Sequence, residues 1–163
     1  MFRASWLVTA PLARPSPGES GRLWGWPHCP AGSPAAKIRH VTRRILIVDD
    51  SESFRSTASV LLAARGFELL ESVSDGEAAL AAVAGDCPDA ILLDINLPGQ
   101  DGFAVAAAIA ATYPAVRIVL TSSDTEDVSG ALLRTCGATA FVPKTELATA
   151  DLETLFNGAA PER

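Results

Sequence analysis

From Arg43 onward, short apolar runs alternate with longer stretches rich in Ala and Leu, and this alternation constrains the fold more than any other feature. A short run of consecutive apolar residues is typical of a strand that is buried on both faces. The stretches between the runs are long enough for helices. Strands that alternate with helices predict an α/β fold, a parallel sheet with helices on both faces. The five predicted strands are residues 45–48, 67–70, 90–93, 116–120 and 139–142.

Capping and breaking residues indicate where the helices begin and end. Ser74 followed by Glu77 has the capping-box spacing that opens a helix, and Ser123 followed by Glu126 repeats it. Gly66 is expected to end the first helix, because glycine readily adopts the left-handed conformation found there. These signals agree with the positions of the apolar runs.

Three carboxylates stand at points where the predicted parallel strands end. Asp49 and Asp50 come directly after the first run, and Asp94 comes directly after the third. In a parallel sheet the carboxyl ends of all strands lie at one edge, and ligands bind there where the strand order reverses. The flavodoxin-like, doubly wound order 2-1-3-4-5 makes the first and third strands neighbours. Thr121 ends the fourth strand and Lys144 follows the fifth, so we expect these five side chains to meet in one crevice.

The five side chains suggest phosphoryl chemistry with a metal ion. Crowded carboxylates repel each other unless a cation compensates their charge. Mg²⁺ prefers oxygen ligands and combines one or two carboxylates with phosphate oxygens and water. An ammonium and a hydroxyl stabilise charge on a transferring phosphoryl group, and a carboxylate can accept that group as an aspartyl-phosphate. Any one of these residues alone also fits a surface cap or an ordinary ion pair, but the whole set favours a shared site.

The sequence resembles the receiver domain of two-component response regulators over about residues 43–158. The resemblance is carried by "ILIVDD", "SDGEAAL", "ILLDINLPGQDGF", "IVLTSSD" and "GATAFVPK", whose order and spacing are specific. One departure is that Lys144 is followed by Thr145, whereas many receivers have Lys-Pro there.

The resemblance implies a role for each matching position. Asp94 would be the phosphoacceptor. Asp49, Asp50 and Asp94 would hold Mg²⁺ together with the backbone carbonyl of Asn96. Thr121 and Lys144 would contact the phosphoryl oxygens, and Phe141 matches the aromatic switch position that turns inward when the threonine moves. The implied site residues are Asp49, Asp50, Asp94, Asn96, Thr121, Phe141 and Lys144.

The resemblance also implies partners and an output surface. A histidine kinase or a histidine phosphotransfer protein would supply the phosphoryl group, and an unknown downstream protein would read it. The output face would be the fourth helix, fifth strand and fifth helix, roughly residues 125–157, with phosphorylation-dependent homodimerisation as one outcome. The fifth helix is predicted to leave Leu147 and Ala150 nearer the solvent. Its predicted buried stripe is Ala148, Leu152, Leu155 and Phe156.

The expected class is a phosphorelay switch rather than a metabolic enzyme, with chemistry limited to its own phosphorylation and dephosphorylation. The chain ends at Arg163, so we expect a single-domain response regulator without direct DNA binding. A net charge of −6 also argues against a general binder of nucleic acid. Three cysteines without metal-ligand spacing indicate thiols and a cytoplasmic protein.

Two other classes of protein remain open. A phosphatase of the haloacid dehalogenase type also forms an aspartyl-phosphate at the end of a parallel strand. It normally has a second Asp two residues after the nucleophile, where this chain has Asn96. The other alternative is a receiver-like interaction module that never takes phosphate. Such modules usually lack one of the acidic residues or the lysine, and all are present here.

Residues 1–42 differ in composition from the predicted receiver domain, residues 43–160. The first 40 residues contain all three tryptophans and six of the eleven prolines, and they show neither a helical nor a strand period. We expect a disordered extension or one created by a wrongly assigned start near Val41. A signal peptide is a weaker alternative, because Pro11 interrupts the apolar run after Arg3. No apolar run approaches the ~20 residues of a membrane span, so no membrane association is expected.

Overall fold

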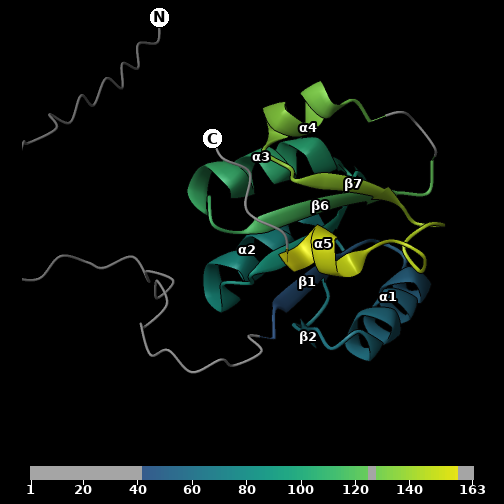
Figure 1. Ribbon diagram of the computed structural model, residues 1–163. Coiled ribbons are helices and arrows are strands. Elements are labelled where there is room, and N and C mark those ends of the chain that lie inside the picture. The colour runs from purple at the N-terminus through teal and green to yellow at the C-terminus, as the bar shows by residue number, and fades with distance from the viewer. Residues whose placement is uncertain (1–41, 125–127, 158–163) are drawn as a thin grey trace, which may run out of the picture. The chain divides into compact units, whose positions relative to one another are not determined.

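The computed structural model describes residues 42–124 and 128–157, which form a parallel sheet between two layers of helices (Figure 1). The predicted extension, apart from Thr42, lies outside the described residues. The main sheet consists of β1 (Arg44–Val48), β2 (Glu68–Leu69), β3 (Ala90–Asp94), β6 (Arg117–Ser122) and β7 (Ala140–Pro143). The helices are α1 (Glu52–Ala64), α2 (Gly76–Asp86), α3 (Gly102–Thr112), α4 (Gly130–Cys136) and α5 (Leu152–Asn157).

The strand order is β2-β1-β3-β6-β7, and every pairing in this sheet is parallel. This order confirms the predicted fold class and the doubly wound order 2-1-3-4-5. The strand β3 lies at the centre and is buried at all five positions, as expected for a strand covered on both faces. A second, two-stranded antiparallel sheet of β4 (Asn96–Leu97) and β5 (Gln100–Asp101) was not predicted.

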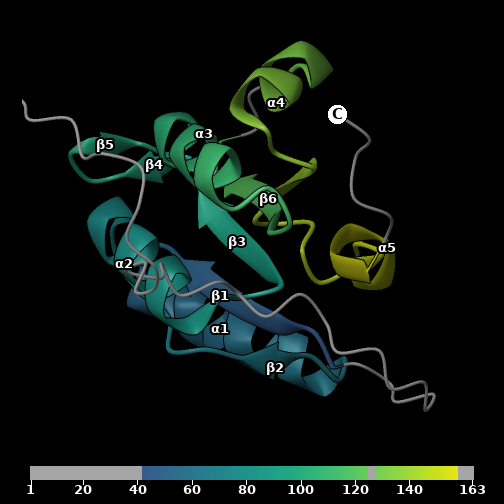
Figure 2. The ribbon, with the colours of Figure 1, turned by 90° about the vertical axis from the view of Figure 1, so that its left-hand side faces the viewer.

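Alternate side chains of each strand enter different halves of the core. On β3, Ile91 and Leu93 belong to the half covered by α2, α3 and α4. Leu92 belongs to the half covered by α1 and α5, where the rings of Phe67 and Phe156 pack edge to face. The two helical layers can be followed in Figures 1 and 2. Helices on both faces leave the carboxyl edge of the sheet open for polar residues.

Two predicted helix starts are displaced. The N-cap of α2 is Asp75 rather than Ser74, and its Oδ1 accepts a hydrogen bond from Ala78 N at 2.8 Å. The N-cap of α4 is Ser129 rather than Ser123. In both cases the cap is the residue whose oxygen reaches the backbone N–H three positions on. Glu126 lies outside the described residues.

The prediction for the fifth helix is wrong at its beginning. Leu147 is buried at 3% exposure, and Ala148, expected in the buried stripe, is exposed. The physical reason is that residues 144–149 form turns and α5 begins only at Leu152, so the helical period does not apply before that residue. Leu152 and Phe156 are buried as predicted.

The cysteines only partly follow the prediction of thiols. Cys136 is a free, buried thiol at the end of α4. Cys87 is disulfide-bonded, so the prediction is wrong for that residue. Cys29 lies outside the described residues. In the described part of the chain, no helix is long and apolar enough to cross a bilayer.

A close backbone approach at Gly102 yields a test of how the carboxyl edge is packed. A Cβ at Gly102 would lie 2.3 Å from Asp94 O and 2.5 Å from Ile95 Cα. We expect Gly102→Ala to lower the free energy of unfolding by roughly 1–3 kcal/mol, because backbone atoms cannot give way as a flexible side chain does. Gly85→Ala is the matched control, since a Cβ there meets nothing within 4 Å. Urea denaturation measures the free energy of unfolding of both variants. Equal values for Gly102→Ala and Gly85→Ala would contradict this packing.

Candidate functional site

Three carboxylates meet at the carboxyl edge of the sheet. Asp94 is the last residue of β3, and Asp49 and Asp50 directly follow β1. Because β1 and β3 pair with Val48 opposite Leu93, Asp49 and Asp94 come level with each other. One ligand oxygen from each of the three carboxylates lies within 4.8 Å of the other two. Asp49 and Asp94 are buried, at 0% and 2% exposure, whereas Asp50 is exposed at the rim.

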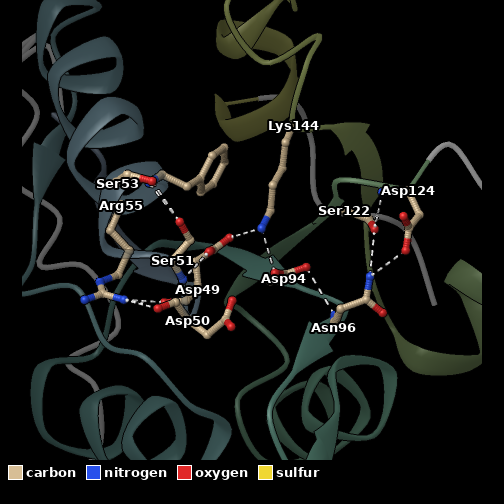
Figure 3. Close-up of polar contacts among 11 residues, drawn as sticks. Asp49, Asp50, Ser51, Ser53, Arg55, Asp94, Asn96, Ser122, Asp124 and Lys144 are labelled. Atoms are coloured by element: carbon tan, nitrogen blue, oxygen red, sulfur yellow. Dashed lines mark hydrogen bonds and ion pairs between the residues drawn. The ribbon is translucent and has the colours of Figure 1, made fainter.

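Lys144 brings a positive charge to the two buried carboxylates (Figure 3). It directly follows β7, and its Nζ lies 2.6 Å from Asp49 Oδ2 and 2.7 Å from Asp94 Oδ2. The ammonium also lies 4.7 Å from the centroid of the Phe54 ring. The lysine side chain is only 12% exposed, so these contacts are poorly screened by water. The structure thus brings Lys144 together with Asp49 and Asp94 as the strand order predicted.

Burial and charge shift two pKa values at this site. Burial raises the pKa of Asp49 above its usual value, although the hydrogen bond from Lys144 opposes that shift. For Lys144, burial alone would lower the pKa, but its close contacts with Asp49 and Asp94 and the attraction of their charges together outweigh burial and raise it. The lysine therefore stays protonated at neutral pH. Its single charge faces three carboxylates, which leaves the cluster with an excess of negative charge.

Main-chain amides orient the two buried carboxylates. Ser51 N donates to Asp49 Oδ1 at 2.9 Å, and Asn96 N donates to Asp94 Oδ1 at 3.1 Å. With Oδ2 of each aspartate on Lys144, both oxygens of each buried carboxylate have a partner. Among residues 42–124 and 128–157, the carboxylate of Asp50 has no hydrogen bond or ion pair.

The end of β6 adds hydroxyl groups to the same edge. Thr121 pairs with Asp94 across the sheet and is fully buried. Its Oγ1 has no hydrogen-bond partner within the described residues. A buried hydroxyl without a partner costs free energy, so this atom is available to a ligand oxygen. Ser122 Oγ instead accepts from Asn96 Nδ2 at 3.0 Å, which ties the end of β6 to the segment after β3.

Phe141 lies on β7, the strand that Lys144 follows. It is opposite Leu120, one residue before the pair formed by Thr121 and Val142. Its side chain is half-buried and packs against the core half that contains α3 and α4. This position lies next to Thr121 in the sheet, but the switch role of Phe141 stays a prediction.

Several residues of the site were missed from the sequence. Arg55 Nη1 donates to the carbonyl oxygens of Asp49 at 2.6 Å and Asp50 at 3.1 Å. Phe54 lies beneath the lysine ammonium, and Ser51 and Ser122 hold Asp49 and Asn96. Their position in the sequence could have indicated this, because Phe54 and Arg55 fall in the first turns of the helix that follows the acidic pair.

The residues present fit a hard divalent cation. The cluster offers carboxylate oxygens within one small radius, one of them exposed to incoming ions, and it carries more negative charge than Lys144 balances. Mg²⁺ accepts such oxygen ligands and retains water at its other positions. The donor set contains no sulfur or imidazole, which would favour softer metals.

Comparisons with known proteins agree with this geometry. A family model described as "Response regulator receiver domain" matches residues 45–156. A protein-glutamate methylesterase/protein-glutamine glutaminase from Anaeromyxobacter dehalogenans is 39% identical over 67% of this chain and 32% of its own length. The signal receiver domain of NarL from Mycobacterium tuberculosis has a TM-score of 0.62 at 30% identity, over 70% of this chain and 96% of that one. Vibrio cholerae CheY4, a chemotaxis response regulator, has a TM-score of 0.60 at 28% identity, over 72% of this chain and 99% of that one.

The prediction that the protein is not an enzyme is contradicted by the relatives. Several of them are named as protein-glutamate methylesterase/protein-glutamine glutaminase, which is an enzyme name. The chain spans about a third or less of the length of these proteins. The expectation failed because motifs for taking up phosphate do not reveal what chemistry accompanies them in a longer protein.

Proposed function

The chain belongs to the response regulator receiver domain family, and from that premise we propose that it is a phosphorelay switch whose phosphoacceptor is Asp94. One observation carries this proposal. The Asp94 carboxylate is buried at a strand end, within 4.8 Å of two further carboxylates and 2.7 Å from an ammonium. A carboxylate in such a setting can act as a nucleophile toward phosphorus.

The transfer would use the residues of the cluster in separate roles. A phosphohistidine of a histidine kinase or phosphotransfer protein would meet Asp94. One Asp94 oxygen would form the new bond to phosphorus as the bond from phosphorus to the histidine nitrogen breaks. The Lys144 ammonium and the Thr121 hydroxyl would then bind phosphoryl oxygens, which gives the unpartnered Oγ1 of Thr121 a partner. Donors prepared in advance for developing charge lower the barrier.

Mg²⁺ would be held by the carboxylates of Asp49, Asp50 and Asp94 and by the backbone carbonyl of Asn96. When bound, it supplies positive charge that offsets the negative charge of the carboxylates and the phosphoryl group. Asp49 and Asp50 would bind and orient the ion beside Asp94, while the Lys144 ammonium lies between the Asp49 and Asp94 carboxylates (Figure 3).

The output would leave through α4, β7 and α5. Phosphorylation would favour a conformer in which Thr121 approaches the phosphoryl group and Phe141 turns inward. A downstream protein, or a second copy of the chain, would bind that face. We propose that residues 43–160 form this receiver domain, that residues 1–42 are an extension, and that the protein works in the cytoplasm, where histidine kinases present their phosphohistidine.

Incubation with acetyl phosphate and Mg²⁺ tests the proposal. We expect intact-mass measurement to show one phosphoryl group that is lost in base, and peptide mapping after hydroxylamine treatment to locate it at Asp94. Excess EDTA should prevent labelling, because the repelling carboxylates would then lack their cation. Labelling at a hydroxyl residue, or labelling that EDTA does not affect, would rule this function out.

A further inference from the structure

The three carboxylates of the cluster differ in how they are held. Asp49 and Asp94 each have one oxygen on a main-chain amide and the other on Lys144. Asp50 has neither kind of contact among the described residues, although its oxygen lies in the same 4.8 Å cluster. An exposed carboxylate without partners depends on its backbone for its direction.

Arg55 holds that backbone. Its Nη1 donates to both carbonyl oxygens of the acidic pair, at 2.6 Å for Asp49 and 3.1 Å for Asp50 (Figure 3). The two carbonyls belong to the consecutive peptide groups on either side of the Asp50 Cα, within the connection from β1 to α1. Fixing both peptide planes also fixes the direction in which Asp50 leaves the main chain. Arg55 is half-buried as a residue, and its charge-assisted hydrogen bond to Asp49 O is part-buried while that to Asp50 O is exposed.

We propose that Arg55 is a positioning residue for divalent cation binding, acting through the main chain of Asp49 and Asp50 to keep the Asp50 carboxylate in the cluster. This inference rests on the proposed function, in which the cluster binds Mg²⁺. Arg55 itself touches neither the cation nor the phosphoryl group in this arrangement.

Removal of Arg55 should change the Mg²⁺ affinity in two opposite ways, one through its charge and one through its hydrogen bonds. A guanidinium near the site repels a divalent cation, so loss of its charge alone would strengthen Mg²⁺ binding. Loss of the two hydrogen bonds would free the Asp50 backbone and weaken binding. Groups that orient metal ligands are worth about 10–100-fold in metal affinity, whereas the repulsion from a partly exposed charge is screened by water and salt. The positioning effect is therefore the larger one.

Mg²⁺ titration by isothermal calorimetry tests the inference on the full chain. We expect Arg55→Met to bind Mg²⁺ about tenfold or more weakly than wild type. Arg55→Lys keeps the charge and can reach one carbonyl, so its affinity should lie between the two. Arg65→Met is the matched control, because Arg65, the C-cap residue at the other end of α1, also donates to a backbone carbonyl, Ala148 O at 3.2 Å. Its Mg²⁺ affinity should equal that of wild type.

Circular dichroism on each sample reports the folded fraction, so that affinity is compared between folded proteins. Equal or tighter Mg²⁺ binding by Arg55→Met, with normal binding by wild type, would overturn the role of Arg55 and leave the proposed function intact. A fall in stability with unchanged affinity would likewise reduce Arg55 to a structural residue. Absence of Mg²⁺ binding by the wild type would overturn the metal site and this inference together.

Discussion

Replacement of Asp94 by Asn is expected to abolish phosphorylation while leaving the fold intact. The amide cannot act as the nucleophile, so intact-mass measurement should show one phosphoryl group on the wild type and none on Asp94→Asn. Without Mg²⁺ the free energy of unfolding should stay equal or rise. Asp49 keeps Lys144 paired at 2.6 Å, and one of the repelling carboxylates is gone.

Asp124→Asn is the control for this result. Asp124 is an exposed carboxylate on the same edge, and its Oδ2 lies 3.4 Å from Asn96 Nδ2, outside the acidic cluster. The Asp124→Asn variant should be phosphorylated at the wild-type rate. Equal labelling of wild type and Asp94→Asn would show that another residue is the acceptor, whereas unfolding of Asp94→Asn would show that the carboxylate is needed for packing.

The sheet could be predicted because parallel strands covered on both faces leave a direct trace in the sequence. Residues 90–93 are uninterrupted apolar residues, and the structure buries every position of Ala90–Asp94. Helix ends were harder, because adjacent residues such as Ser74 and Asp75 can both cap a helix. The prediction for the residues around Leu147 was wrong for another reason. A helical period was extended over residues that form turns, and nothing in their composition marks where α5 begins.

The acidic cluster could be predicted because strand order alone brings Asp49 and Asp94 to one edge. The contacts that orient this cluster could not. Arg55 and Ser51 act through backbone groups, Arg55 on main-chain carbonyls and Ser51 through its own amide. Every residue but proline has the same backbone groups, so such hydrogen bonds have no characteristic spacing of side-chain types. The reactive side chains of such a site can thus be predicted from the sequence, whereas the backbone hydrogen bonds that orient them cannot.

Replacement of Lys144 by Met should lower both stability and the rate of phosphorylation. The variant keeps the apolar stem but leaves the buried carboxylates of Asp49 and Asp94 without a cation. Removal of one partner from a buried ion pair costs about 3–5 kcal/mol, which urea denaturation in EDTA would measure. Loss of a group that stabilises the transferring charge should slow phosphorylation by acetyl phosphate about a hundredfold or more. Mg²⁺ should restore part of the stability but not the rate.

The stability deficit of Lys144→Met should depend on pH in a direction that identifies its cause. Burial already raises the pKa of Asp49, and loss of the lysine removes the main opposing contact, so that pKa should rise further. A carboxyl whose pKa is higher in the folded than in the unfolded state stabilises the fold at low pH, and that contribution is lost as pH rises through the folded pKa. The difference in the free energy of unfolding between Lys144→Met and wild type should therefore increase as pH rises and decrease as pH falls. Asp49→Asn in the Lys144→Met background should recover part of the lost stability, because the unpaired charge at Asp49 is then gone while that of Asp94 remains. A deficit that is constant with pH and unaffected by Asp49→Asn would show that lost packing of the lysine stem, rather than an unpaired carboxylate, destabilises the variant.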